Sequence, residues 1–207
     1  MKNKVFQTNL GIKISKKYNN SFLDKIPRFI FIGKLDRNKN PLMAIKIISQ
    51  LISSNYKVEF SLWGDGKLKD EVLMKLKDLR DYTSTKVEYQ SRVSHNMVIR
   101  KIKEFDCFIM TSLSEGTPLS LLEAMSHGLI CFVTPVGGIK NIIINEYNGV
   151  FIDINNIGET VNKIIKILSD KGKREEIRKN AINTIKKFYS PDVLLKRYMR
   201  ITLDEKY

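Results

Sequence analysis

The chain has 207 residues, of which 43% are hydrophobic and 28% are charged, proportions that are ordinary for a globular domain. Its 36 Lys and Arg residues outnumber its 22 Asp and Glu residues, which gives a formal net charge of +14 at pH 7. The longest apolar runs are too short to cross a bilayer, and the first residues lack the apolar segment of a signal peptide. A cytoplasmic location is therefore expected.

The positive charge is compatible with an anionic partner but does not identify its chemical class. No aromatic-basic strip and no nucleic-acid motif accompanies the lysines, so nucleic acid is not expected as a partner. The lysines are spread over segments of helical periodicity, which leaves open a peripheral contact with anionic lipid headgroups at the inner face of a membrane. A background bias is the alternative, because Lys, Asn and Ile are frequent along the whole chain.

Neither the cysteines nor the histidines form a metal-ligand pattern. Cys107 and Cys131 lie inside apolar runs, which predicts buried free thiols. His95 and His127 have no second ligand at a suitable spacing, so no metal site is predicted.

Short β-branched or aromatic runs alternate with longer runs of helical periodicity, a pattern typical of a layered βαβ fold. Residues 1–27 are polar and basic and are predicted to form a linker or arm. Residues 28–190 are predicted to form a single Rossmann-like α/β domain with a doubly wound parallel sheet of about six strands. Residues 191–207 would add a C-terminal helix. The strands are expected at Arg28–Gly33, Lys57–Gly64, Lys86–Gln90, Asp106–Ser112, Leu129–Thr134 and Gly149–Asp153.

Helices are predicted between these strands and after the last one. Proline at the first turn and apolar residues at helical spacing are the signals. The helices are expected to begin near Pro41, Leu68, Asn96 and Pro118 and, after the last strand, to run from Ile157 to about Phe188 and onward from Pro191.

The turn after the fourth strand carries the most informative motif. Ligands of open parallel sheets bind beyond the carboxyl ends of the strands, which is where this turn lies. If Pro118 begins a helix there, the amides of Leu119, Ser120 and Leu121 are free to bind a phosphate or diphosphate, assisted by the helix dipole. Gly116 would let the backbone approach that ligand closely.

Two glutamates flank this helix start. Glu115 precedes the helix, and Glu123 lies inside it, about 7.5 Å along the axis from Pro118 by helical rise. This spacing argues against a close pair of catalytic carboxylates and favours two separate hydrogen-bonding positions. Glu123 interrupts an apolar helix, where a carboxylate is costly unless it is hydrogen-bonded or faces a polar ligand. Ligand contact is favoured over the alternative, a helix cap plus one exposed Glu.

Several motifs follow the order found in one enzyme family. The segment Glu115–Glu123 (EGTPLSLLE) resembles the E-x7-E motif of retaining GT-B glycosyltransferases of family 4. The similarity runs from Arg28 to Tyr198. Its other landmarks are FIGKLDRNKN (31–40), which resembles the family's G-R-L…K-G turn, WGDG (63–66), EAM (123–125), HG (127–128), PVGGI (135–139) and NG (148–149).

The resemblance implies roles at the donor site. Glu115 would contact the transferred sugar as the catalytic residue, and Glu123 would hold the ribose hydroxyls. Lys34 and Lys39 would neutralise the donor diphosphate; Lys34 stands where the family usually has Arg and keeps only a point charge. The backbone that would meet the sugar and phosphates is that of Gly116, Thr117, Pro118, Leu119 and Ser120. Ordinary surface lysine is the alternative for Lys34 and Lys39.

The other motif positions receive less specific roles. Arg92 and Val93 fall where the family's base pocket lies, but Arg92 replaces a common glycine, so the base stays open. Gly64 and Gly66 are interpreted as turn residues. The pair Gly137-Gly138 either lines the crevice or shapes its own turn.

The function implied is the donor-binding half of a GT-B enzyme that moves a sugar from a nucleotide-diphosphate sugar to an acceptor hydroxyl with retention, in bacterial polysaccharide or glycolipid synthesis. Lysines and a helix dipole would replace a metal, so no metal or other cofactor is implied. The segment Thr8–Lys13 resembles the linker that joins the two halves, and the helix Pro191–Ile201 resembles the one that crosses back.

The acceptor-binding half would then be a separate N-terminal domain, in cis or in trans, without which the chain is expected to be inactive. The chain is interpreted as one domain, a truncated product or a subunit of a split enzyme. Two further hypotheses stay open: a non-catalytic nucleotide-sugar-binding module, and a basic protein that associates with a membrane or nucleic acid.

Overall fold

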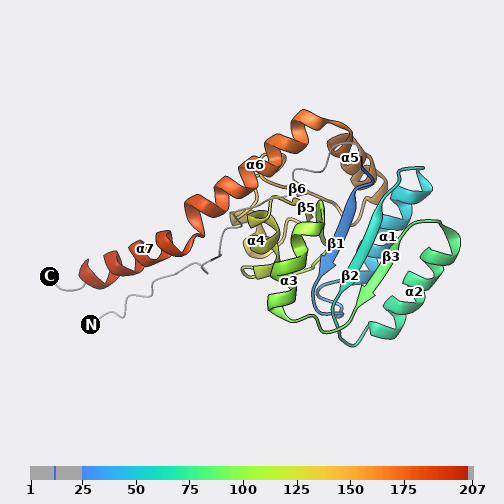
Figure 1. The fold of residues 1–207 in the computed structure, drawn as a ribbon, viewed down its shortest axis with the longest axis horizontal. Helices are drawn as coiled ribbons and strands as arrows, with labels where there is room; N and C mark the ends of the chain where they lie inside the picture. The colour runs from blue at the N-terminus through green and yellow to red at the C-terminus, as the bar shows by residue number, and fades with distance from the viewer. Residues whose placement is uncertain (1–11, 13–24, 205–207) are drawn as a thin grey trace.

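The computed structural model describes residue 12 and residues 25–204. Six parallel strands form one sheet in the order β3-β2-β1-β4-β5-β6 (Figure 1). All six predicted strands are present, each somewhat shorter than its predicted range. They are β1 (Arg28–Ile32), β2 (Glu59–Trp63), β3 (Val87–Gln90), β4 (Cys107–Met110), β5 (Ile130–Val133) and β6 (Val150–Phe151).

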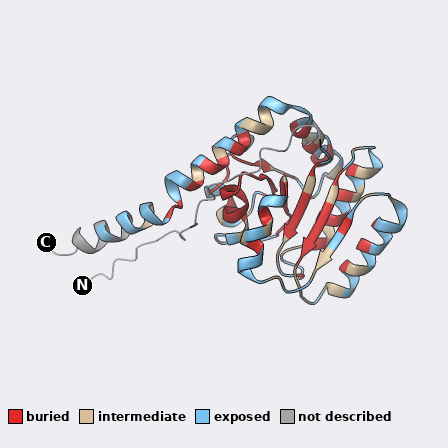
Figure 2. Cartoon of the chain, viewed as in Figure 1, coloured by how far each residue is buried: buried red, intermediate tan, exposed pale blue. Residues whose placement is uncertain are grey.

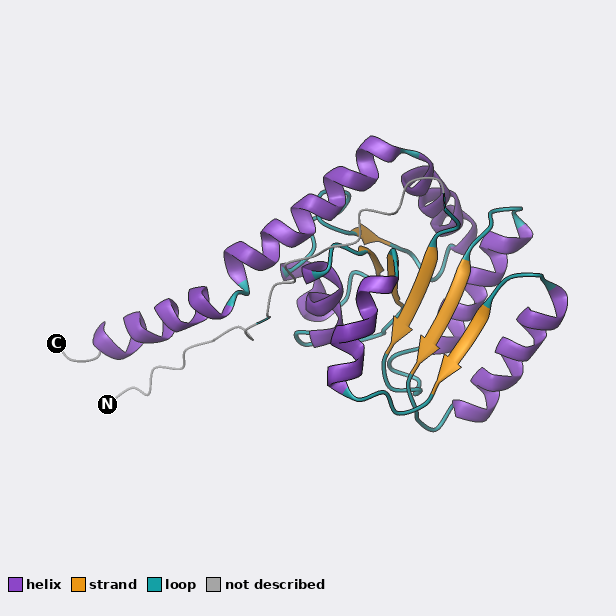
Figure 3. Ribbon diagram, in the orientation of Figure 1, coloured by secondary structure: helices purple, strands orange, loops and turns teal. Residues whose placement is uncertain are grey.

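Helices cover both faces of this sheet, as a doubly wound fold requires (Figure 3). Helices α1, α2 and α5 pack on one face, and α3, α4 and most of the buried side of α6 pack on the other. The bounds are α1 (Pro41–Ser53), α2 (Lys69–Tyr82), α3 (His95–Lys101), η1 (Ile102–Glu104), α4 (Leu119–Ser126), η2 (Gly137–Asn141), α5 (Ile157–Ser169), α6 (Lys171–Phe188) and α7 (Pro191–Asp204).

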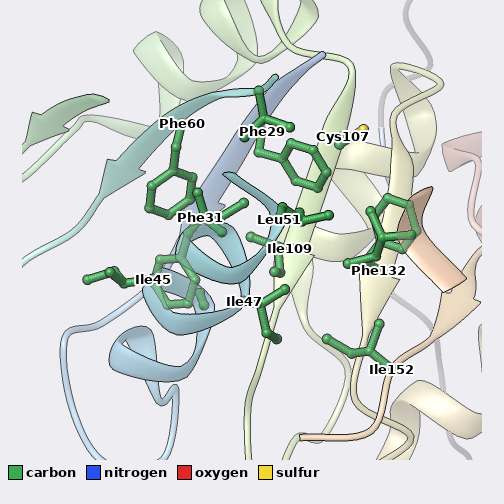
Figure 4. Close-up of a cluster of buried hydrophobic side chains, with 14 of the residues drawn as sticks. Phe29, Phe31, Ile45, Ile47, Leu51, Phe60, Cys107, Ile109, Phe132 and Ile152 are labelled. Atoms are coloured by element: carbon green, nitrogen blue, oxygen red, sulfur yellow. The ribbon is translucent and has the colours of Figure 1, made fainter. Parts of the chain in front are cut away.

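The central strands are apolar along their whole length because both of their faces are covered. In β4, Cys107 and Ile109 point into the cluster under α1, α2 and α5, while Phe108 and Met110 point into the cluster under α3, α4 and α6. Within the first cluster, Phe29 of β1 stacks on Phe132 of β5 with ring centroids 5.9 Å apart (Figure 4). This stack joins strands on both sides of β4.

The C-terminal helices continue the chain beyond the sheet. Helix α6 buries Ile177, Ala181, Ile182 and Ile185 on one side, whereas α7 extends away from the sheet and is largely exposed where its side chains are described (Figures 1 and 2). Of the predicted N-terminal arm, residues 1–11 and 13–24 lie outside the described residues. Ile12 is described: it is buried, and its amide donates to the carbonyl oxygen of Tyr189, 2.7 Å away. No helix in the described ranges is long and apolar enough to cross a membrane.

The order of the strands reverses between β1 and β4. The chain passes outward from β1 to β2 and β3, and then returns to place β4 on the other side of β1. The turns after β1 and β4 therefore leave the sheet toward opposite faces, and a ligand site is expected between them. Both turns carry residues that the sequence predicts for the donor site.

We predict that Phe132→Ala lowers the free energy of unfolding by about 3–5 kcal/mol, because it removes a fully buried ring from the packed stack. Urea unfolding of the 207-residue chain measures the loss. Tyr82→Ala is the control, since Tyr82 is exposed and its replacement should change stability by less than about 0.5 kcal/mol. Equal effects of the two substitutions would contradict this description of the core.

Candidate functional site

Hydrogen bonds join the β1–α1 turn directly to the β4–α4 turn. The Leu113 amide donates to the Asn38 carbonyl oxygen at 2.8 Å, and the Asn38 side-chain amide donates to the Ser114 carbonyl oxygen at 3.0 Å. The Thr111 hydroxyl donates to the carbonyl oxygen of Asn40 at 2.7 Å. Asn40 has a φ of 52°, a left-handed conformation that Asn tolerates better than most residues. Two segments more than 70 positions apart are thereby held side by side.

This junction brings Lys39 and Glu115 together. Lys39 Nζ lies 2.5 Å from Glu115 Oε1, and the two side chains are 25% and 8% exposed. The Lys39 amide also donates to Asp36 Oδ1 at 2.9 Å, which fixes the turn from which Lys39 projects. Lys34 lies elsewhere: its side chain is 70% exposed, and its Nζ is 3.9 Å from Asp36 Oδ2. The structure thus pairs one of the two predicted lysines with the predicted catalytic glutamate.

Glu123 is buried inside α4 and is hydrogen-bonded to a residue that the sequence analysis did not select. Its Oε1 lies 2.6 Å from Nε2 of His95, at the first residue of α3. A carboxylate oxygen can only accept, so Nε2 carries the proton. The sequence predicts no metal-ligand role for His95 and assigns it no other role. Its place after β3, at the same edge of the sheet as α4, was the signal that could have identified it.

The start of α4 differs from the expectation in one respect. The helix begins at Leu119, and Pro118 is its N-cap with a ψ of 112°. The prediction that the Leu121 amide is free is wrong. This amide donates to the Pro118 carbonyl oxygen at 3.2 Å, which tightens the first turn of the helix. Within the described part of the chain, the amides of Leu119 and Ser120 have no acceptor.

Gly116 and Thr117 complete this turn. A side chain at Gly116 would meet nothing within 4 Å, so the backbone of the turn borders open space there. Thr117 is exposed. The two free amides of α4 and this accessible backbone lie in the same short segment of chain as Glu115.

Gly137 and Gly138 pack against the turn that contains Glu115. A β-carbon would lie 2.0 Å from the Glu115 carbonyl oxygen at Gly137, which also has a φ of 46°, and 1.8 Å from the Gly116 carbonyl oxygen at Gly138. The Gly138 amide donates to the same Glu115 oxygen at 3.0 Å. The pair therefore supports the motif by close backbone packing, the turn-shaping alternative of the two interpretations.

The turn after β2 is built on glycine in the same way. A β-carbon would lie 1.9 Å from the Gly33 carbonyl oxygen at Gly64 and 2.4 Å from the Leu35 carbonyl oxygen at Gly66. Between these glycines, Asp65 accepts the Leu35 amide on its carbonyl oxygen at 2.9 Å. The turns after β1 and β2 are thus packed backbone to backbone.

Arg92 ties the β3–α3 loop to this pair of turns. Its Nε lies 2.9 Å from Asp65 Oδ2, and its φ is 41°, in the left-handed region. A glycine would adopt this conformation with less strain than an arginine. The hydrogen bond from Arg92, followed by one from the Gly66 amide, lowers the pKa of the Asp65 carboxyl below its usual value.

The remaining titratable candidates are structural. His127 is buried, its Nδ1 lies 3.0 Å from the Glu123 carbonyl oxygen, and burial lowers its pKa. Cys107 and Cys131 are buried free thiols, as predicted, and burial raises the pKa of both. Among the described residues, no group of three or more His, Cys, Asp or Glu side chains could hold a metal ion.

A groove of about 1200 Å³ lies away from these turns, between α1 and α2. Its lining includes Lys46, Ser49, Tyr56, Lys75 and Tyr82. None of the predicted donor-site residues lines it. The candidate site is therefore the open edge at the turns.

Comparison with known proteins gives the family. The profile of the glycosyl transferases group 1 matches residues 14–184. The chain belongs to this family. The Escherichia coli UDP-Gal:alpha-D-GlcNAc-diphosphoundecaprenol alpha-1,3-galactosyltransferase is 31% identical to it over 168 residues, which cover 78% of this chain and 39% of that enzyme.

Solved structures share the fold of this chain. TarM of S. aureus, crystallised with UDP and other ligands, superimposes with a TM-score of 0.77 and 20% identity over 94% of this chain and 38% of its own. The C-terminal domain of LpcC, a group 1 glycosyltransferase of Francisella tularensis, superimposes with a TM-score of 0.69 and 19% identity. The match covers 80% of this chain and 89% of the LpcC domain. The chain thus has the fold of the C-terminal half of a GT-B glycosyltransferase, which confirms the predicted fold class.

We predict that Arg92→Gly raises the pKa of Asp65 toward the ordinary value, measured by NMR titration of the carboxyl. A depressed folded-state pKa contributes stability that is present above the unfolded-state pKa and is lost as the pH falls through the folded-state pKa. The variant should therefore lose less stability on acidification than the unmodified chain.

Lys69→Ala is the matched control, because Lys69 lowers the Asp65 pKa least of the causes that act on it. It should raise that pKa by less than Arg92→Gly does. An Asp65 pKa that is the same with and without Arg92 would contradict the assigned contact.

Proposed function

We propose that this chain is the donor-binding half of a retaining hexosyltransferase, which moves a sugar from a nucleotide-diphosphate sugar to an acceptor hydroxyl. The observation that carries the proposal is the meeting of Lys39, Glu115 and the α4 start where the strand order reverses. Beyond that junction, Glu123 supplies a second, buried carboxylate on the same helix.

The leaving diphosphate would be held by positive charge and amides. Lys39, the free amides of Leu119 and Ser120 and the α4 dipole supply these groups, and the exposed Lys34 adds a charge from the same turn as Lys39. Lysine and amide donors of this kind require no metal, and we propose that none is used, nor any other cofactor. The backbone from Gly116 to Pro118 borders the space in which the sugar and phosphates would lie.

The Lys39–Glu115 ion pair suggests how the donor would enter. The Lys39 ammonium and the Glu115 carboxylate lie 2.5 Å apart and compensate each other's charge. A diphosphate would compete for the Lys39 ammonium, and the released Glu115 carboxylate would then accept hydrogen bonds from the transferred sugar. This exchange makes Glu115 the catalytic residue in contact with substrate. Attack from the side of the leaving group would retain the anomeric configuration, without the paired carboxylates of a retaining glycosidase.

The acceptor would come from outside this chain. The chain spans 39% of the E. coli relative, so we propose that an N-terminal GT-B domain, in cis or in trans, binds the acceptor and that the chain alone does not transfer sugar. Exposed Leu195 and Met199 on α7 would pack on that domain. The E. coli relative's name gives a diphosphoundecaprenol-linked acceptor, which supports a lipid-linked sugar or glycan here. Work at the cytoplasmic face of a membrane, aided by the basic surface, fits such an acceptor.

We predict that isothermal titration detects binding of at least one of UDP, ADP and GDP to the 207-residue chain. Lys39→Met and Glu123→Ala should each weaken it about ten-fold or more, since each removes a hydrogen bond to a charged group. Lys75→Met and Glu71→Ala, on α2, are matched controls and should bind normally. No binding of any of the three nucleotides, or normal binding by Glu123→Ala, would overturn the donor-site assignment.

We further predict sugar transfer, with retained configuration, once an N-terminal GT-B domain is supplied as a fusion or a separate chain. Glu115→Gln should lower the rate by about 10²–10³-fold. It should bind the nucleoside diphosphate at least as tightly as the unmodified chain, because Lys39 is no longer paired. Nucleotide binding without transfer would instead favour a non-catalytic binding module, and inversion of configuration would contradict the retaining mechanism.

A further inference from the structure

Glu123 has a single hydrogen-bond partner for its carboxylate within the described part of the chain. That partner, His95, comes from α3, so the contact joins the first residue of α3 to the middle of α4. The Glu123 side chain is only 7% exposed, whereas the His95 side chain is 69% exposed. A surface imidazole therefore holds a carboxylate that lies almost entirely inside the protein.

The other oxygen of this carboxylate is left unbonded but accessible. No hydrogen bond to Glu123 Oε2 exists among residues 25–204. Across the same described residues, Ser112 Oγ is the only fully buried side-chain oxygen or nitrogen without a partner, so Glu123 Oε2 must reach solvent. Water or a donor group of a ligand can reach this oxygen only through that opening, so a ligand hydroxyl there would replace water as its hydrogen-bond donor.

We propose that His95 is a positioning residue for the ribose of the donor: it fixes the Glu123 carboxylate so that Oε2 faces the two vicinal ribose hydroxyls. The inference rests on the proposed function, since Glu123 is there the residue that holds the ribose. A carboxylate that is bound through one oxygen cannot rotate freely. Its second oxygen therefore keeps one direction before the nucleotide arrives, which lowers the entropy lost on binding.

The backbone holds His95 in place for this task. Ser94 caps α3 with its side chain, and Val98, one turn further along, is buried in the core. On the other side, Arg92 ties the loop to Asp65. The backbone of His95 is thus held from both sides, by the loop before it and by the helix after it, although its own ring is exposed.

This arrangement predicts a selective loss. Replacing His95 with Ala leaves the ribose-binding carboxylate in place but frees it to rotate, so the cost falls on ligands that use Glu123. A nucleotide without the two ribose hydroxyls has no such contact to lose. Base stacking on His95, or damage to the fold, would instead weaken both ligands alike.

The test is isothermal titration of the complete 207-residue chain with two probes. They are whichever of UDP, ADP and GDP binds the unmodified chain most tightly, and the 2′,3′-dideoxy form of that nucleotide. We expect His95→Ala to weaken the ribonucleotide about five- to ten-fold, the size of the cost of ordering one side chain on binding, and to leave the dideoxy nucleotide within about two-fold. His95→Gln keeps an N–H donor and should recover most of the loss.

Two controls complete the experiment. Asn96→Ala, at the next position of α3, which is also exposed, should bind both probes normally. In a Glu123→Ala background, His95→Ala should have no further effect, because the residue acts through Glu123. The melting temperature of each variant shows that the fold is kept.

Three outcomes would overturn the inference: normal ribonucleotide binding by His95→Ala, equal losses with both probes, or an additive loss in the Glu123→Ala background. If His95→Ala binds the ribonucleotide normally while Glu123→Ala binds it more weakly, only the role of His95 is contradicted and the proposed function stands. Failure of the unmodified chain to bind any of the three nucleotides removes the proposed function as well.

Discussion

The hydrogen bonds between the β1–α1 and β4–α4 turns hold together the two halves of the sheet at its edge. Leu113 and Thr111 bond to the backbone of Asn38 and Asn40, so Lys39, which lies between those two asparagines, is carried to Glu115. Neither β1 nor β4 could place these residues alone, because their helices leave toward opposite faces. The junction therefore determines where the charges of the candidate site lie, and the glycines at 137 and 138 hold its other side.

Three pairs of opposite charge or of donor and acceptor follow one another along this edge. Lys39 meets Glu115 and Arg92 meets Asp65, and each of these pairs joins two different turns, whereas the pair of His95 and Glu123 joins helix α3 to helix α4. Two of the acceptors, Glu115 and Glu123, are almost buried, where an unpaired carboxylate would be costly. The pairs satisfy these groups within the chain, and beside them the amides of Leu119 and Ser120 and one carboxylate oxygen of Glu123 have no hydrogen-bond partner among the described residues.

The sequence was sufficient for the sheet because the buried strands are short apolar runs separated by strong turn signals, as in β4 and β5. It also located the motif turn, since Pro118 and Glu115 have clear local signatures. It could not give the His95–Glu123 contact, which joins positions 28 apart through the geometry of two helices. Nor could it show that the Leu121 amide is taken, because that depends on the extended ψ of Pro118, a property of the folded turn.

The faces of the sheet are covered by helices, whereas the surface beside the candidate site is exposed. Both sheet faces are covered by helices, so the core of the domain is closed without a partner. Beside the motif turn, in contrast, Leu113 and Leu119 are exposed, and they flank the groups that the proposed function assigns to sugar and phosphate. Electrostatic stabilisation of a leaving diphosphate is stronger where water is excluded. On that function, a second domain that covers these leucines would both bring the acceptor and lower the local dielectric around Lys39, so binding and chemistry would be separable between this chain and its partner.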